Sequence, residues 1–203
     1  MKFLLAIAGL IDRLNERVGR TVLWLTLVVV IVSAGNAVVR KVFHTSSNAW
    51  LELQWYLFGA IFLLASGYTY LRNEHVRVDV LSSRFPAKVQ VWIEIIGIVF
   101  FIFPAAGLIF WLSLPYFYDS WRLQELSSNT GGLIRWPAKL LIPVGFALLI
   151  LSGVSKLIKC VAYLAGHGPN PLVPAQTKSA EEELAEEIQK QAEARLSGGA
   201  EAR

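Results

Sequence analysis

Polar residues able to take part in chemistry gather near the start of one apolar stretch, residues 50–71. Two of them, Glu52 and Tyr56, share with Trp55 and Gly59 the spacing i, i+3, i+4 and i+7. A helix would place all four on one face. A carboxylate in a first helical turn either interacts favourably with the helix dipole or makes a polar contact with a partner subunit. The spacing leaves both interpretations open.

Charged residues follow the same stretch. Arg72 comes first, and His75, Arg77 and Asp79 then alternate with valines. In an extended segment alternate side chains point to opposite sides, so the valines would rest against membrane or protein while the charges pair. One histidine and one aspartate are too few ligands for a metal site. The pattern therefore indicates either topological charge or the docking of another subunit.

The elements that must position these residues are apolar helices. Four runs, at about 21–39, 50–71, 91–118 and 137–165, are near or above the roughly 20 residues that span a bilayer. They do not alternate in hydrophobicity as the strands of a membrane barrel do. The sequence predicts an all-α membrane protein with four transmembrane helices in a domain of residues 20–165. Asn36 and Arg40, at the end of the first run, could meet Glu52 across the short connection.

Composition supports a membrane protein. Hydrophobic residues make up 55% of the chain and charged residues 17%, whereas a soluble domain is about 45 to 50% apolar and about a quarter charged. The net charge of +4 comes from basic residues scattered at the ends of apolar runs, so no nucleic-acid partner is predicted. The distribution of Lys and Arg predicts that both termini are cytoplasmic.

Three segments flank the spans. Residues 1–19 show helical periodicity with apolar and charged faces, which predicts an amphipathic helix in the headgroup plane; a flexible lead-in is the alternative. Residues 166–178 are rich in glycine and proline and predict a linker. Residues 179–203 predict a short charged helix or tail, which is marginal by itself in water.

Small residues and prolines predict how the spans pack. Glycine, alanine and serine on the second span, together with Gly97 and Gly107 on the third, would permit close approach of these two helices. Pro104 and Pro143 each remove a backbone hydrogen bond and favour a kink. Lys156 and Lys159 lie close enough to a span end for their ammonium groups to reach the membrane surface.

The chain lacks the residues that catalysis or ion coupling would require. The middles of the four runs contain no ionisable residue, although such residues mark ion pathways and proton relays. The three histidines lie outside the runs, so axial haem ligands are missing, and the single Cys160 excludes a thiol pair. We predict that the chain is not an enzyme and binds no cofactor or metal.

The second run and its exit resemble a known family. Residues 52–58 read Glu-Leu-Gln-Trp-Tyr-Leu-Phe, Gly67 and Tyr68 follow, and residues 73–79 read Asn-Glu-His-Val-Arg-Val-Asp. This pattern resembles the small membrane subunit, the DctQ-like family, of tripartite ATP-independent periplasmic (TRAP) transporters. The resemblance covers the layout of residues 12–163, and the final tail lies outside it.

The resemblance implies a function. In that family a periplasmic binding protein delivers an organic acid to a large permease subunit of the bacterial inner membrane, which imports it with sodium ions bound in the large subunit. The small subunit would brace the permease. The residues predicted to form this subunit interface are Glu52, Trp55, Tyr56, Gly59, Arg72, His75, Arg77 and Asp79. The binding protein would touch the outer loops, at Arg40, Lys41, Asp119, Arg122 and Arg135. The alternatives are a self-oligomerising small channel or exporter and an assembly factor for another membrane complex.

Overall fold

The computed structural model describes residues 1–45, 47–73 and 85–172, and these residues confirm the all-α prediction. The helices are α1 (Lys2–Phe43), α2 (Asn48–Leu71), α4 (Ala87–Gly97), the π-helix η1 (Ile98–Ile102), α5 (Phe103–Arg122) and α6 (Trp136–Leu164). Because α4, η1 and α5 follow one another directly, the described residues form four helical stretches long and apolar enough to cross a membrane. Of the predicted linker 166–178, residues 166–172 are described; residues 173–178 and the predicted helix or tail 179–203 lie outside the described residues, which end at Leu172.

The first helix is longer than the predicted first span. α1 runs without a break for 42 residues and joins residues 1–19 to the run at 21–39. At 1.5 Å per residue it is about 63 Å long, roughly twice the thickness of the hydrocarbon layer. It ends at His44, whose left-handed backbone (φ 50°) closes the helix after Arg40 and Lys41. The position of residues 1–19 in the headgroup plane stays a prediction.

Pro104 has a visible effect on the third span. Proline has no N–H to donate to the carbonyl four residues earlier, so a regular α-helix cannot continue unchanged through it. The chain adopts the wider π-helical turn over residues 98–102, and the N–H of Phe103 donates to the carbonyl of Ile98, five residues back. At Pro143 α6 continues as one helix.

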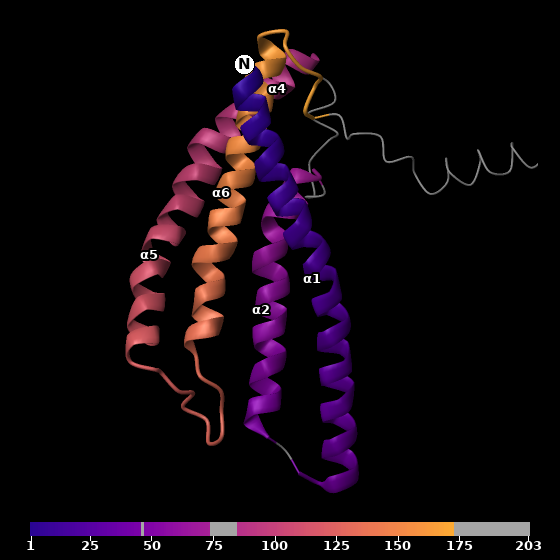
Figure 1. Cartoon of the computed structure of the whole chain (residues 1–203), viewed down its shortest axis with the longest axis vertical. Helices are drawn as coiled ribbons and strands as arrows, with labels where there is room; N and C mark the ends of the chain where they lie inside the picture. Colours follow the sequence, from indigo (N-terminus) through magenta and orange to yellow (C-terminus); the bar gives the residue numbers. More distant parts are fainter. Residues whose placement is uncertain (46, 74–84, 173–203) are drawn as a thin grey trace, which may run out of the picture. The chain divides into compact units, whose positions relative to one another are not determined.

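Helices α2 and α6 occupy the middle of the described bundle. Figure 1 shows them side by side, with α1 next to α2 and α5 next to α6. The hydroxyl of Ser152 donates to the carbonyl of Gly67 across the α2–α6 contact at 2.8 Å. A Cβ added at Gly67 would lie 2.9 Å from the carbonyl oxygen of Leu148, so glycine is required for this approach.

The predicted partner of the small residues on α2 is wrong. Gly67 and Ser66 face α6 instead of the third span, and Ser66 lies within hydrogen-bond distance of the Gly145 carbonyl. Gly97 and Gly107 have no described atom within 4 Å of an added Cβ. Small residues mark where backbones can approach closely, but they do not specify which helix approaches.

Gly145 provides a test of this packing. A Cβ at Gly145 would lie 2.7 Å from the backbone oxygen of Leu63, and backbone atoms cannot move aside cheaply. We expect Gly145→Ala to destabilise the protein by about 1 to 3 kcal/mol, the usual cost of overpacking. The measurement is thermal unfolding in detergent, with Gly107→Ala, where the added methyl meets open space, as the matched control. Equal unfolding temperatures for the two variants would contradict the close contact.

The outer surface of the bundle is apolar. Phe62 on α2 is 78% exposed and Trp111 on α5 is 72% exposed, and similar residues line α1. In a soluble monomer so many exposed aromatic and aliphatic side chains would be unusual. Together with the four long apolar helices, this surface shows a multi-pass membrane protein.

Candidate functional site

Glu52 holds the loop between α5 and α6. It lies in the first turns of α2, yet it is only 5% exposed. One carboxylate oxygen accepts hydrogen bonds from the Ser127 hydroxyl and from the Asn129 amide at 2.8 Å. The other accepts the backbone N–H of Leu133 at 2.7 Å. We call this arrangement the Glu52 latch.

The loop is shaped to fit the carboxylate. Leu126 and Ile134 form an antiparallel bridge, and the N–H of Ser127 donates to the carbonyl of Leu133 at 3.0 Å. Gly131 turns the chain with a φ of +72°, a conformation that glycine adopts without strain. A Cβ at Gly132 would lie 2.8 Å from a Glu52 oxygen. The two glycines therefore let the backbone close around the carboxylate.

Two more contacts fasten α2 to this loop. The side-chain amide of Asn48 donates to the carbonyl of Thr130 at 2.9 Å, and the Tyr56 hydroxyl donates to the carbonyl of Ile134 at 3.3 Å. Sequence reasoning missed the latch, because it considered only the dipole, a partner subunit, and Asn36 with Arg40 as contacts for Glu52. The sequence feature that could have indicated a tight loop at this position is the turn-forming run at residues 127–132, Ser-Ser-Asn-Thr-Gly-Gly.

The four predicted residues on α2 separate into two groups. Glu52 and Tyr56 face the loop of their own chain. Trp55 is 68% exposed, and Gly59 has no described atom within 4 Å of an added Cβ. The helical turn explains the division, because residues 52 and 56 are about 40° apart around the axis while residue 55 lies about 60° to the other side of residue 52. Trp55 and Gly59 thus remain open to a partner.

The residues predicted after α2 are only partly described. Arg72 pairs with Glu16 of α1 at 2.9 Å, and its guanidinium lies 5.5 Å from the centre of the Tyr68 ring. The described contacts of Arg72 are therefore with α1 and α2 of its own chain, and its predicted role at a subunit interface stays a prediction. His75, Arg77 and Asp79 lie outside the described residues, and their role in subunit docking stays a prediction.

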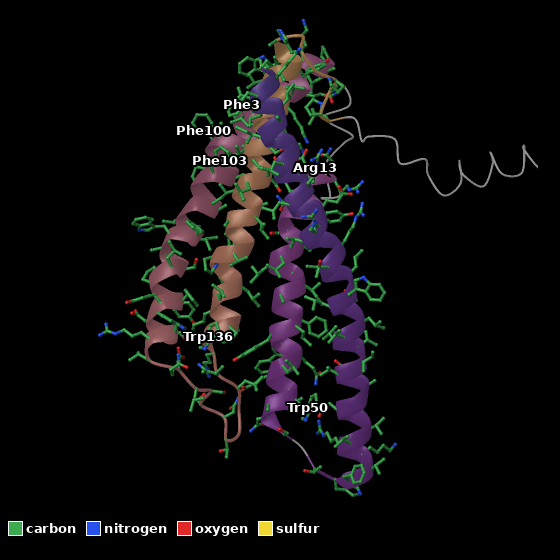
Figure 2. All side chains as sticks on the ribbon, viewed as in Figure 1. Phe3, Arg13, Trp50, Phe100, Phe103 and Trp136 are labelled. Atoms are coloured by element: carbon green, nitrogen blue, oxygen red, sulfur yellow. The ribbon has the colours of Figure 1, made fainter. Side chains whose placement is uncertain are left out.

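The five residues predicted to meet a binding protein lie at the end of the bundle that carries the α5–α6 loop. We call this the loop end; Trp50 and Trp136 mark the starts of α2 and α6 there (Figure 2). Arg40, Lys41, Asp119 and Arg122 are exposed. Arg135 is partly buried, lies 3.5 Å from Glu125 and donates to the Ser128 hydroxyl at 3.1 Å. Arg135 therefore also serves the structure of the loop.

Glu125 joins the loop to α6. Its carboxylate pairs with Lys139, whose ammonium also lies 3.9 Å from the centre of the Tyr116 ring. The hydrogen bond from Lys139 lowers the pKa of the Glu125 carboxyl below its ordinary value of 4.5. The ionised form of Glu125 thus helps to fix the end of the loop.

The pH dependence of stability tests this pair. Because the folded-state pKa of Glu125 is lowered, its contribution is complete above pH 4.5 and is lost as the pH falls through the folded-state pKa. We expect Glu125→Gln to unfold at a lower temperature than the wild type at neutral pH, and the two to converge in acid, where the wild-type carboxyl is also neutral. Unfolding temperatures measured from about pH 7 to about pH 3 would show this convergence. A constant difference over that range would contradict it.

The opposite end of the bundle holds a second polar cluster, for which Arg13 on α1 is a landmark in Figure 2. Lys156 of α6 pairs with Glu94 of α4 at 3.0 Å, and the Tyr70 hydroxyl of α2 donates to the same carboxylate at 3.0 Å. The Lys156 residue is only 4% exposed, so the prediction that its ammonium reaches the membrane surface is wrong. Nearby, Lys159 pairs with Asp12 of α1. Ion pairs thus join α6 to α4 and to α1, and the Tyr70 hydrogen bond adds α2.

Among the described residues, no group of three or more His, Cys, Asp or Glu side chains lies close enough to hold a metal ion. The two polar clusters are satisfied mainly by groups of this chain. Their contacts connect helices of this chain with one another and with the α5–α6 loop.

Comparison with known proteins gives one family. The family model described as "Tripartite ATP-independent periplasmic transporters, DctQ component" matches residues 29–162. The match covers α2, α4, η1 and α5 completely and most of α6. Nothing matches the chain among curated proteins or among solved structures.

Proposed function

Because the chain belongs to the DctQ family of TRAP transporters, we propose that it is the small, non-catalytic subunit that braces the large permease in the bacterial inner membrane. The permease would carry out sodium-coupled uptake of an organic acid delivered by a periplasmic binding protein. The sodium sites would lie in the large subunit.

One observation carries the bracing role. Residues 21–39, 53–71, 95–118 and 140–155 contain no Asp, Glu, Lys, Arg or His. Charged side chains inside a membrane protein mark ion and proton pathways. The described charged clusters lie toward the two ends of the helices, where they join helices of the same chain. This distribution suits a rigid support better than a chain that moves solutes.

The surface proposed for the permease is the outward face of α2. Trp55, Phe58 and Phe62 are exposed along it, and Gly59 lies open among them. Glycine and aromatic side chains together allow a second helix to approach closely and pack. Arg77 and Asp79 are proposed to continue this contact beyond Asn73.

The surface proposed for the binding protein is the loop end. The Lys and Arg distribution predicts cytoplasmic termini, which would turn this end toward the periplasm. The Glu52 latch and the Glu125–Lys139 pair hold the loop in one conformation. Asp119, Arg122 and Arg135 are then presented together at the end of α5 and in the loop.

Co-purification tests the proposal. A tagged full-length chain expressed with its neighbouring transport genes should retain a much larger membrane protein, and Gly59→Leu should lower that recovery severalfold without changing the unfolding temperature of the isolated chain. Gly9→Leu is the matched control, because Gly9 also has open space around it but lies on α1. Solute accumulation by liposomes that contain only this chain would refute the proposal.

A further inference from the structure

A cavity that is open over much of its surface lies between the last turns of α1 and the first turns of α2, at the loop end. Its volume is about 550 Å³, within the range of ligand-binding pockets. Its polar lining consists of Ser33, Asn36, Arg40, Lys41, His44 and Gln54. The Ser33 hydroxyl donates to the side-chain oxygen of Gln54 at 3.1 Å, which connects the two helices at the cavity.

The cavity is positively charged. None of the described lining residues is acidic, and within the described part of the chain neither Arg40 nor Lys41 forms an ion pair. Glu52, the nearest carboxylate along α2, is committed to the α5–α6 loop. Two unneutralised cations beside amide and hydroxyl groups favour an anion with several oxygen acceptors, such as a phosphate group.

The surroundings of the cavity are apolar. Ala37 and Leu51 complete its lining. On α1, Val42 is 62% exposed and Phe43 is 69% exposed, and Trp50 is exposed at the start of α2. The cavity lies where two membrane-length helices end, which is the level of the lipid headgroups. A ligand that fits this place has an anionic head and apolar chains.

We propose that this cavity binds the phosphate headgroup of an anionic glycerophospholipid, with the acyl chains along the exposed apolar surface of α1. A docked acidic protein surface is the weaker candidate, because it would meet the exposed Val42 and Phe43 side chains as well as the two cations. This proposal takes Arg40 and Lys41 out of the set predicted to touch the binding protein. It concerns the isolated chain and does not depend on the transport role.

Lipid titration of the purified full-length chain tests the proposal. The delipidated protein is titrated with phosphatidylglycerol and, separately, with phosphatidylcholine of the same acyl chains, and bound lipid is counted by native mass spectrometry. We expect tighter binding of phosphatidylglycerol to the wild type. The double variant Arg40→Gln, Lys41→Gln should weaken that binding at least about tenfold and abolish the preference between the lipids.

Two further variants separate the cavity from general charge. Arg13→Gln with Arg17→Gln removes the same charge from exposed positions on α1 outside the cavity, and should leave binding unchanged. Ala37→Phe keeps both cations but fills the cavity, and should also lose phosphatidylglycerol. Because it retains the charges, Ala37→Phe decides the question even where the double variant is not recovered folded.

Four results would overturn the proposal. They are unchanged phosphatidylglycerol binding in the Arg40 and Lys41 double variant, an equal loss in the Arg13 and Arg17 control, retained binding in Ala37→Phe, and, in a parallel titration, inorganic phosphate alone that binds as tightly as the lipid. If the double variant kept lipid binding but lost the binding protein, the cavity would be a protein-docking surface. Failure to co-purify with a permease would refute the proposed function without affecting any of these measurements.

Discussion

Glu52→Ala is expected to release the α5–α6 loop from α2 and to lower the stability of the protein by about 3 kcal/mol. The substitution leaves the Ser127 hydroxyl, the Asn129 amide and the Leu133 N–H without the carboxylate that accepts their hydrogen bonds. A hydrogen bond to a charged group contributes about 1.5 to 3 kcal/mol. The three donors are half-buried or exposed, so water can replace part of what they lose. Thermal unfolding in detergent measures the loss.

A thiol-accessibility assay shows whether the loop itself moves. In a Cys160→Ser background, a cysteine at Ser128 should react faster with a membrane-impermeant reagent when Glu52 is alanine. Glu52→Gln is the matched control, since it keeps one acceptor oxygen but places an amide where the other oxygen was; its effect should be intermediate. Wild-type stability and reactivity in Glu52→Ala would show that the latch does not hold the loop.

Release of the α5–α6 loop should also weaken transport by the complex. The exposed Asp119 and Arg122 end α5, and the loop that follows them is fixed by the latch. If a binding protein docks at this end, Glu52→Ala should reduce transport more than it reduces co-purification of the permease. Glu52 is then a positioning residue for docking.

The spans could be predicted from the sequence because their signal is local. Length and apolar composition decide whether a segment crosses a bilayer, and neither requires knowledge of its neighbours. The predicted run at 50–71 agrees closely with α2 at Asn48–Leu71, and the run at 137–165 agrees with α6 at Trp136–Leu164. The family resemblance on α2 and its exit was confirmed by the match over residues 29–162.

The contacts between spans could not be predicted, because they depend on which helices become neighbours. Gly67 was recognised as a site of close approach, but its neighbour is α6 instead of the third span. Glu52 was recognised as unusual, but the groups that donate hydrogen bonds to it come from residues 127–133, about 80 positions later. Local patterns identify such residues, and only the helix order of the bundle supplies their partners.

Lys156 illustrates the same limit, and its substitution should have the second large effect. We expect Lys156→Met to destabilise the protein by about 3 to 5 kcal/mol, because it removes one member of a buried ion pair and leaves the Glu94 charge in a place of low solvent access. Methionine fills a similar volume, so the loss reports charge and not a cavity. The unfolding free energy, obtained from titration with SDS, measures it.

The control is an exposed ion pair on α1. Arg20 is paired with Glu16 at 2.8 Å, but its side chain is 71% exposed, so Arg20→Met should cost only about 0 to 1 kcal/mol. The double variant Lys156→Met, Glu94→Gln should be more stable than Lys156→Met alone, because it removes the Glu94 charge together with the Lys156 charge that it pairs with. Simply additive losses for Lys156→Met and Glu94→Gln would mean that the two charges are not coupled. In that case the brace between α4 and α6 would rest on apolar packing around η1, where Ile102 lies beside Gly153.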